Sequence, residues 1–259
     1  KGEWGMSVAA SPSDGQKIDI GASVRAAYSV VIENAHLAVD LAWLPFAIVV
    51  AAELVALVVG GGGFIGRALS GLVYGLGFLV FGTIFIVRWH RFILLGERGG
   101  AGLFPPGWSL FFLAGLKVAL IVLAGIIVLA LLAAVPPHFL TGLIAVIGGI
   151  VLAFGAARVS LIFPAAAIER PIGLREAWDL LAGNYWRLFA CLLLCYLPFG
   201  IVHYILEQIG LGLPWIMWFV LQVIGLAVSF AGAAVVASLL SDVYRGFRPA
   251  VTQAERRAS

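Results

Sequence analysis

Six apolar segments, each near the roughly 20 residues that a helix needs to cross a bilayer, dominate this sequence. They are predicted at Leu37–Val59, Ala68–Leu95, Leu110–Val135, Phe139–Ala166, Leu188–Glu207 and Trp215–Leu240. Of the 259 residues, 63% are hydrophobic and 11% are charged, whereas a soluble domain is about one-quarter charged. The sequence therefore predicts an all-α, polytopic membrane protein with six transmembrane helices.

Short glycine- or proline-rich breaks join these segments in pairs, at Gly60–Gly63, Pro136–Pro137 and Gly210–Pro214. Glycine and proline mark turns, so we expect three helical hairpins. Basic residues gather on the side away from these turns, whereas the turn side holds only Arg67. The basic residues of the first side are Lys17, Arg25, Arg88, Arg91, Arg98, Arg158, Arg170, Arg175, Arg187, Arg245, Arg248, Arg256 and Arg257. The positive-inside rule then predicts that both termini are cytoplasmic.

Two amphipathic helices are predicted near residues 20–34 and 173–185. In the second, one face is apolar and the other polar, the apolar positions being Leu174, Ala177, Trp178, Leu181, Tyr185 and Leu188. Such a helix either lies flat at the membrane interface or packs on the end of the helix bundle. The pattern of Arg25, Tyr28, Asn34 and Pro45 returns as Arg175, Trp178, Asn184 and Pro198, which indicates an internal repeat.

The rest of the domain organisation is simple. Residues 1–18 are polar and contain glycine, serine and proline, so they are predicted to be a disordered N-terminal tail. Residues 19–245 form a single six-helix domain. Residues 246–259 are expected to be a flexible, basic C-terminal tail. The formal net charge of +3 lies largely on the predicted cytoplasmic side, which suits anionic lipid headgroups. No motif points to nucleic acid.

Charged residues near the cytoplasmic ends of the spans form one candidate site. It consists of Asp40, Arg88, Arg91, Arg158, Asp242 and Arg245. An arginine below the interface needs a partner or must extend its side chain toward water, and Asp40 and Asp242 are the carboxylates expected to pair with Arg91 and Arg158. The cluster is either an anion or lipid-headgroup site, or a set of anchoring arginines with local ion pairs.

A second candidate site lies toward the other side of the membrane and consists of Glu53, His203 and Glu207. Glu53 interrupts an apolar run, where a carboxylate is costly unless it is protonated or paired. His203 and Glu207 are four residues apart and share a helix face. The three groups are candidates for binding a cation or relaying protons. In the alternative, His203 and Glu207 lie at the aqueous edge and only Glu53 is buried.

No motif of a known catalytic centre is present in the sequence. It contains no HExxH, no CxxC, no Ser-His-Asp arrangement with a nucleophile turn and no glycine loop of the phosphate-binding kind. Cys191 and Cys195 are interpreted as small buried residues. We therefore expect a protein that is not an enzyme, with no catalytic residue, cofactor or metal.

The segment RVSLIFPAAAIERPIGLREAWDLLAGNYWRLF, residues 158–189, resembles part of a broad family of bacterial six-helix membrane proteins. The likeness lies in an arginine that ends one span, a proline after it, and an amphipathic helix that leads through Asn-Tyr-Trp-Arg into the next span. Members of that family are similar to the membrane domain attached to some glycerophosphoryl diester phosphodiesterases. The resemblance implies a bacterial inner membrane protein. The catalytic domain of those enzymes has no counterpart here, so their activity is not implied.

These features lead to two hypotheses about function. The first is a non-catalytic membrane protein that acts through helix packing and lipid contact, as an accessory subunit of a larger inner-membrane complex or as an envelope-organising protein. Its expected partners are anionic lipids at the cytoplasmic face and other membrane subunits. The second is a small transporter or channel that uses Glu53 or the cytoplasmic arginine cluster.

Overall fold

The computed structural model describes residues 17–60, 63–99, 102–133 and 138–247, and every regular element in that part of the chain is a helix. Six helices there are long and apolar enough to cross a membrane, at Ala35–Gly60, Ala68–Leu95, Trp108–Leu132, Leu140–Val159, Tyr185–Gly210 and Trp215–Phe247. The prediction of an all-α, multi-pass membrane protein with three hairpins is confirmed. The predicted tails fall almost wholly outside the described residues.

The first hairpin joins α2 (Ala35–Gly60) to a returning helix made of α3 (Gly63–Gly77), η1 (Phe78–Gly82) and α4 (Thr83–Leu95). Glycine allows the two sides to approach closely, since a Cβ on Gly77 would lie only 2.8 Å from the Cβ of Ala52. The π-helical turn η1 widens the returning helix at its middle, a local irregularity that nothing in the sequence predicted.

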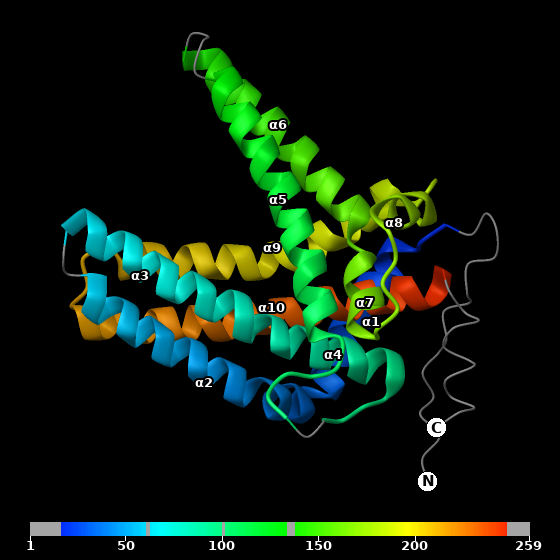
Figure 1. Cartoon of the computed structure of the whole chain (residues 1–259), viewed down its shortest axis with the longest axis horizontal. Helices are drawn as coiled ribbons and strands as arrows, with labels where there is room; N and C mark the ends of the chain where they lie inside the picture. The colour runs from blue at the N-terminus through cyan, green and yellow to red at the C-terminus, as the bar shows by residue number, and fades with distance from the viewer. Residues whose placement is uncertain (1–16, 61–62, 100–101, 134–137, 248–259) are drawn as a thin grey trace.

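The third hairpin contains the central helix of the molecule. It joins α9 (Tyr185–Gly210) to α10 (Trp215–Phe247), and α10 packs against α9, α4, α2 and α1. Within the most apolar stretch of α10, 56% of the residues are buried inside the protein. Figure 1 shows the first and third hairpins running side by side. Together they form a four-helix bundle around α10.

The second hairpin stands apart from this bundle. Its helices are α5 (Trp108–Ala133) and α6 (His138–Val159), and Figure 1 shows them diverging together from the bundle. We call this hairpin the arm. Phe111 near one end of α5 and Ala157 near one end of α6 are the only buried residues in the spans Trp108–Leu132 and Leu140–Val159. The arm is therefore attached at its base and exposes apolar side chains along the rest of its length.

The two helices of the arm interlock through glycine. A Cβ placed on Gly148 would lie 2.2 Å from a methyl carbon of Leu129, whereas one on the neighbouring Gly149 would meet nothing within 4 Å. We expect Gly148→Leu to lower the free energy of unfolding of the protein by about 1–3 kcal/mol through overpacking, while Gly149→Leu leaves it unchanged. Unfolding of both variants in detergent, followed by circular dichroism, tests this difference. Equal stability of the two variants would contradict the described packing.

The predicted fourth span is wrong at its end. The sequence placed one helix over Phe139–Ala166, but α6 stops at Val159 and a separate short helix, α7 (Ile162–Ala167), follows a turn. Pro164 explains the break, because it lacks an N–H group and its ring would clash with the carbonyl of residue 160 in a continuous helix. In α7 the same proline lies in the first turn, where it is tolerated.

Both predicted amphipathic helices are present, as α1 (Ile20–Glu33) and α8 (Leu174–Leu180). α1 packs against α9 and α10, burying Ala27, and the phenol of Tyr28 donates a hydrogen bond of 3.1 Å to the carbonyl of Cys195. α8 packs against α6 instead and is shorter than the predicted segment, since a turn with Gly183 in the left-handed region (φ 78°) precedes α9. The two halves of the suggested repeat therefore have different neighbours.

The end of the bundle that carries the predicted cytoplasmic residues is the more elaborate one. It holds α1, the loop residues 96–99 and 102–107, α7, α8 and the last turns of α10, whereas the end of α2, the start of α3, the end of α9 and the start of α10 lie at the other end (Figure 1). This basal end is where the arm joins the bundle, and it contains most of the arginines singled out by the sequence.

Candidate functional site

Arg91 forms several hydrogen bonds and ion pairs at the basal end. Its side chain is 9% exposed, and its Nε and Nη2 atoms each donate to one oxygen of Glu97 at 2.7 Å. Nη1 donates to the carbonyl of Ala167 at 3.1 Å and lies 3.5 Å from Glu169 Oε2. Arg91 thereby ties α4 to the following loop and to the end of α7.

The expected pairing of Arg91 with Asp40 or Asp242 is therefore wrong. Glu97 comes only two residues after the end of α4, so the chain supplies a carboxylate locally, and Glu169 follows α7. Asp40 is exposed on α2 and forms no ion pair with a described residue. Asp242 is half-buried on α10, close enough to Arg245 to interact electrostatically.

Arg88 and Arg245 are bonded to backbone carbonyls rather than aimed at an open site. Arg88 Nη2 donates to the carbonyls of Gly102 and Leu103, at 2.8 and 3.2 Å. Arg245 Nη2 donates to the carbonyl of Ile93, one of the last carbonyls of α4, which have no partner within their own helix. Both arginines thus fasten α4 to its surroundings.

Arg158 has a different environment, formed by aromatic rings. The central carbon of its guanidinium group lies 3.7 Å from the ring centroid of Trp178 and 4.9 Å from that of Tyr185. Cation–π contacts of this kind stabilise a partly desolvated arginine. The Nε atom is buried and has no hydrogen-bond partner among the residues that the structure describes. Since Arg158 ends α6 while the rings belong to α8 and α9, this contact joins the arm to the third hairpin.

The six residues of the predicted cationic site thus occupy several separate contacts. Arg91, Arg88 and Arg245 fasten α4, Arg158 holds the base of the arm, and Asp242 lies beside Arg245, whereas Asp40 has no ion pair with any residue that the structure describes. Each guanidinium group has partners within the chain, so this arrangement has the geometry of anchoring arginines with local contacts.

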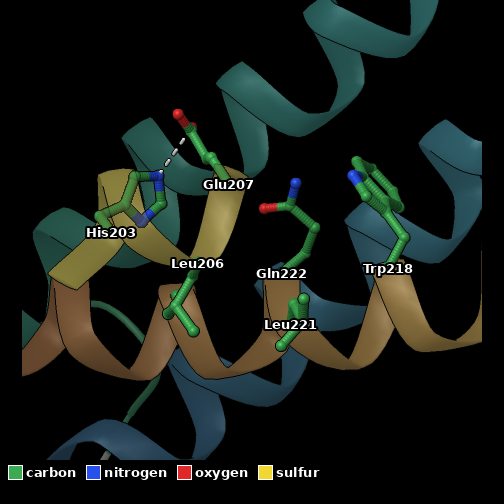
Figure 2. Close-up of a pocket in the computed structure, with 7 residues that line it drawn as sticks. His203, Leu206, Glu207, Trp218, Leu221 and Gln222 are labelled. Carbon is green, nitrogen blue, oxygen red and sulfur yellow. Dashed lines mark ion pairs between the residues drawn. The ribbon is translucent and has the colours of Figure 1, made fainter. Parts of the chain in front are cut away.

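The second predicted site is also divided. His203 Nε2 lies 3.2 Å from Glu207 Oε1, one turn farther along α9, and both side chains are partly exposed. Figure 2 shows this pair beside Trp218 and Gln222 of α10, where the residues line a cavity of about 10 Å³. A cavity of that size holds about one water molecule at most, so it is too small for an organic substrate.

Glu53 is not joined to that pair. It lies on α2, is 8% exposed, and its Oε2 atom has no hydrogen-bond partner in the part of the chain that the structure describes. No hydrogen bond or ion pair among the described residues links it to His203 or Glu207. Glu53 and the His203–Glu207 pair are separated because α2 and α9, the helices that carry them, each pack against α10. The arrangement is the one in which Glu53 alone is buried.

Two buried polar contacts between α4 and α10 were not foreseen. Trp89 Nε1 donates to Ser238 Oγ at 2.9 Å, and His90 Nδ1 lies 2.7 Å from Ser241 Oγ. The sequence offers one signal for these contacts. Ser238 and Ser241 are three residues apart on α10, and their partners are adjacent residues on α4. Both contacts fix the register of α4 on α10.

The two cysteines are fully buried in the packing between α1, α9 and α10, and both are free. Burial raises the pKa of Tyr28, whose hydroxyl group therefore stays a neutral donor to the carbonyl of Cys195.

Within the part of the chain that the structure describes, no group of three or more potential metal ligands comes together.

Comparison of the chain with models of protein families, with curated proteins and with solved structures finds no match in any of the three. The resemblance of residues 158–189 to the membrane domain of glycerophosphoryl diester phosphodiesterases stays a prediction.

Proposed function

We propose that this protein is a non-catalytic membrane protein that acts through helix packing and lipid contact, as an accessory subunit of a larger complex or as an envelope-organising protein of the bacterial inner membrane. The observation that carries this proposal is the arm. None of the residues in the most apolar stretch of α5 and 6% of those in α6 are buried, against 56% in α10.

One face of the arm is suited to close contact with another helix. Gly142, Ala145, Gly149 and Ala153 recur on α6 at helical spacing, and all four are exposed. A Cβ added to Gly142 or Gly149 would meet nothing within 4 Å. Small residues let helix backbones approach closely in membranes, so this face supports a membrane-protein partner.

The basal end supports the second part of the proposal, contact with lipid. Arg25, Arg98, Arg170 and Arg175 are exposed there, and each basic residue near an anionic membrane surface contributes about 1 kcal/mol of attraction. The positive-inside rule puts this end in the cytoplasm. We therefore expect anionic lipid headgroups to bind at that face.

The arm can be tested by a substitution that fills its small-residue face. Gly149→Leu should leave the protein folded but reduce co-purification of a stoichiometric membrane partner at least tenfold, because the new side chain keeps the helices apart. Ile147→Leu, on another exposed face of α6 (Ile147 is 53% exposed), is the matched control and should retain the partner. Equal recovery of the partner with both variants would count against the arm as its binding surface.

A small transporter or channel is the second candidate function, and the buried, unpaired Glu53 is the observation that favours it. If this is the function, Glu53→Gln abolishes flux in proteoliposomes while the protein stays folded. Unchanged flux in the variant would remove the transport proposal.

A further inference from the structure

Glu53 lies well inside the membrane-spanning part of α2. It is seven residues from the end of the helix at Gly60, or roughly 10 Å at 1.5 Å per residue. It belongs to the buried stripe of α2, formed by Leu41, Pro45, Val49, Glu53 and Ala56, which faces the bundle. An ionisable group thus occupies a position where the other residues are apolar.

Among the residues of α3 that the structure describes near this level, none is a cation. The two helices are in close contact at Ala52 and Gly77, where an added Cβ would be 2.8 Å from the Cβ of Ala52. Glu53 is therefore level with about residue 76 of α3. The phenol of Tyr74, on α3, is the titratable group that interacts electrostatically with Glu53, and at neutral pH a phenol carries no positive charge to compensate a carboxylate.

The arginines of α3 and α4 lie far from the level of Glu53 along their helices. Given the Ala52–Gly77 register, the backbone of Arg67 on α3 is about nine residues from the level of Glu53, or roughly 14 Å. Arg88, the first cation on α4, is about twelve residues away on the other side, or roughly 18 Å. The charged residues of α10, Asp242 and Arg245, lie near the basal end of the bundle. The charged residues of α1, and Asp40 of α2, lie near that same end.

A buried carboxylate without a counterion or hydrogen-bond donor is strongly disfavoured in an apolar medium, and binding a proton removes the charge. We propose that Glu53 is a proton-binding site within the membrane-spanning region, occupied by a proton at neutral pH. The proposal rests on the position of Glu53, its 8% exposure and the absence of a partner for Oε2. It is independent of the packing function proposed above.

The same geometry indicates how the site would release its proton. Ionised Glu53 needs water or a cation, and the close contact of α2 with α3 supplies neither. Release therefore requires water or a cation to reach the carboxyl, and Tyr74, which is 37% exposed, is a polar group that interacts with Glu53 electrostatically.

Infrared spectroscopy of the full-length protein in liposomes at pH 7 tests the proposal directly. In the difference spectrum of wild type minus Glu53→Gln, the expected signal is a carboxylic-acid C=O band. The control difference spectrum, wild type minus Glu207→Gln, should not contain this band. A carboxylate band in its place would overturn the proposal. Glutamine resembles the neutral acid in size and charge, so Glu53→Gln should be at least as stable as wild type. A marked loss of stability would indicate an ionised, paired Glu53 and would also overturn the proposal.

Chemical modification gives an independent readout. Dicyclohexylcarbodiimide enters membranes and reacts with protonated carboxyl groups. The acid proton moves to a carbodiimide nitrogen, the carboxyl oxygen bonds to the central carbon, and the acyl group then shifts to nitrogen, so the whole reagent is retained as an N-acylurea. Peptide mass spectrometry should locate this adduct on Glu53 in wild type and in Glu207→Gln. Modification of Glu207 with none on Glu53 would contradict a protonated, reachable Glu53.

Discussion

Replacing Arg91 by leucine is expected to lower the free energy of unfolding by about 3 kcal/mol. A hydrogen bond to a charged group contributes about 1.5–3 kcal/mol, and the total stays near the upper end of that range because Glu97 is 43% exposed and water weakens its two bonds. The substitution removes the two 2.7 Å bonds to Glu97 and leaves the carbonyl of Ala167 without its donor. α4, the following loop and α7 would then separate at the base of the arm. Unfolding of the purified protein in mixed detergent micelles measures the change.

Two control substitutions separate the contributions of Arg91. Glu97→Gln should cost less than Arg91→Leu, since the Glu97 side chain is 43% exposed and water weakens its ion pair. Arg91→Lys keeps the charge but loses the bidentate geometry, so we expect an intermediate loss. If Arg91→Leu unfolds like wild type, the account of Arg91 as the tie between α4 and α7 is wrong.

Replacing Gly107 by alanine should be comparably damaging, at about 3 kcal/mol, for steric reasons. A Cβ at this position would lie 2.5 Å from the carbonyl oxygen of Ala167 and 2.8 Å from that of Ala166. These are backbone atoms, so α5 and α7 would have to move apart. Gly107 also has a φ of 79°, in the region that costs other residues about 1–2 kcal/mol.

Gly96 provides a matched control for that substitution. Its φ of 77° is nearly the same as that of Gly107, but an added Cβ would meet nothing within 4 Å. Gly96→Ala should therefore show only the backbone cost of about 1–2 kcal/mol. Thermal unfolding of the two variants under identical conditions isolates the contact with α7. Equal losses would mean that the base of the arm does not pack as described.

Much of the architecture follows from the sequence because length and hydropathy are direct constraints on a chain in a bilayer. Six long apolar segments and the glycine or proline breaks between them are sufficient for three hairpins. The way in which α5 and α6 together stand apart from the bundle is not predictable from length and hydropathy. Lipid tails are as apolar as leucine, so the residues of a helix that faces lipid and of one that faces protein look alike.

The candidate sites were predicted less well, for local reasons. Glu97 and Glu169 lie in loops, and the loop conformation that brings them to Arg91 cannot be read from helical periodicity. The break after Val159 follows from Pro164, but the aromatic environment of Arg158 depends on how α8 folds back. The burial of Glu53 follows from an apolar run, whereas its separation from His203 depends on which helices surround α10.

Native mass spectrometry of the wild-type protein, extracted from its own membrane in mild detergent, is the decisive test of the proposed packing role. We expect the 27.4 kDa chain to be recovered at fixed stoichiometry with a membrane-protein partner and with anionic lipid bound. Recovery of the chain alone, free of bound lipid and protein, together with cation or proton flux in liposomes, would contradict a packing role and identify a transporter.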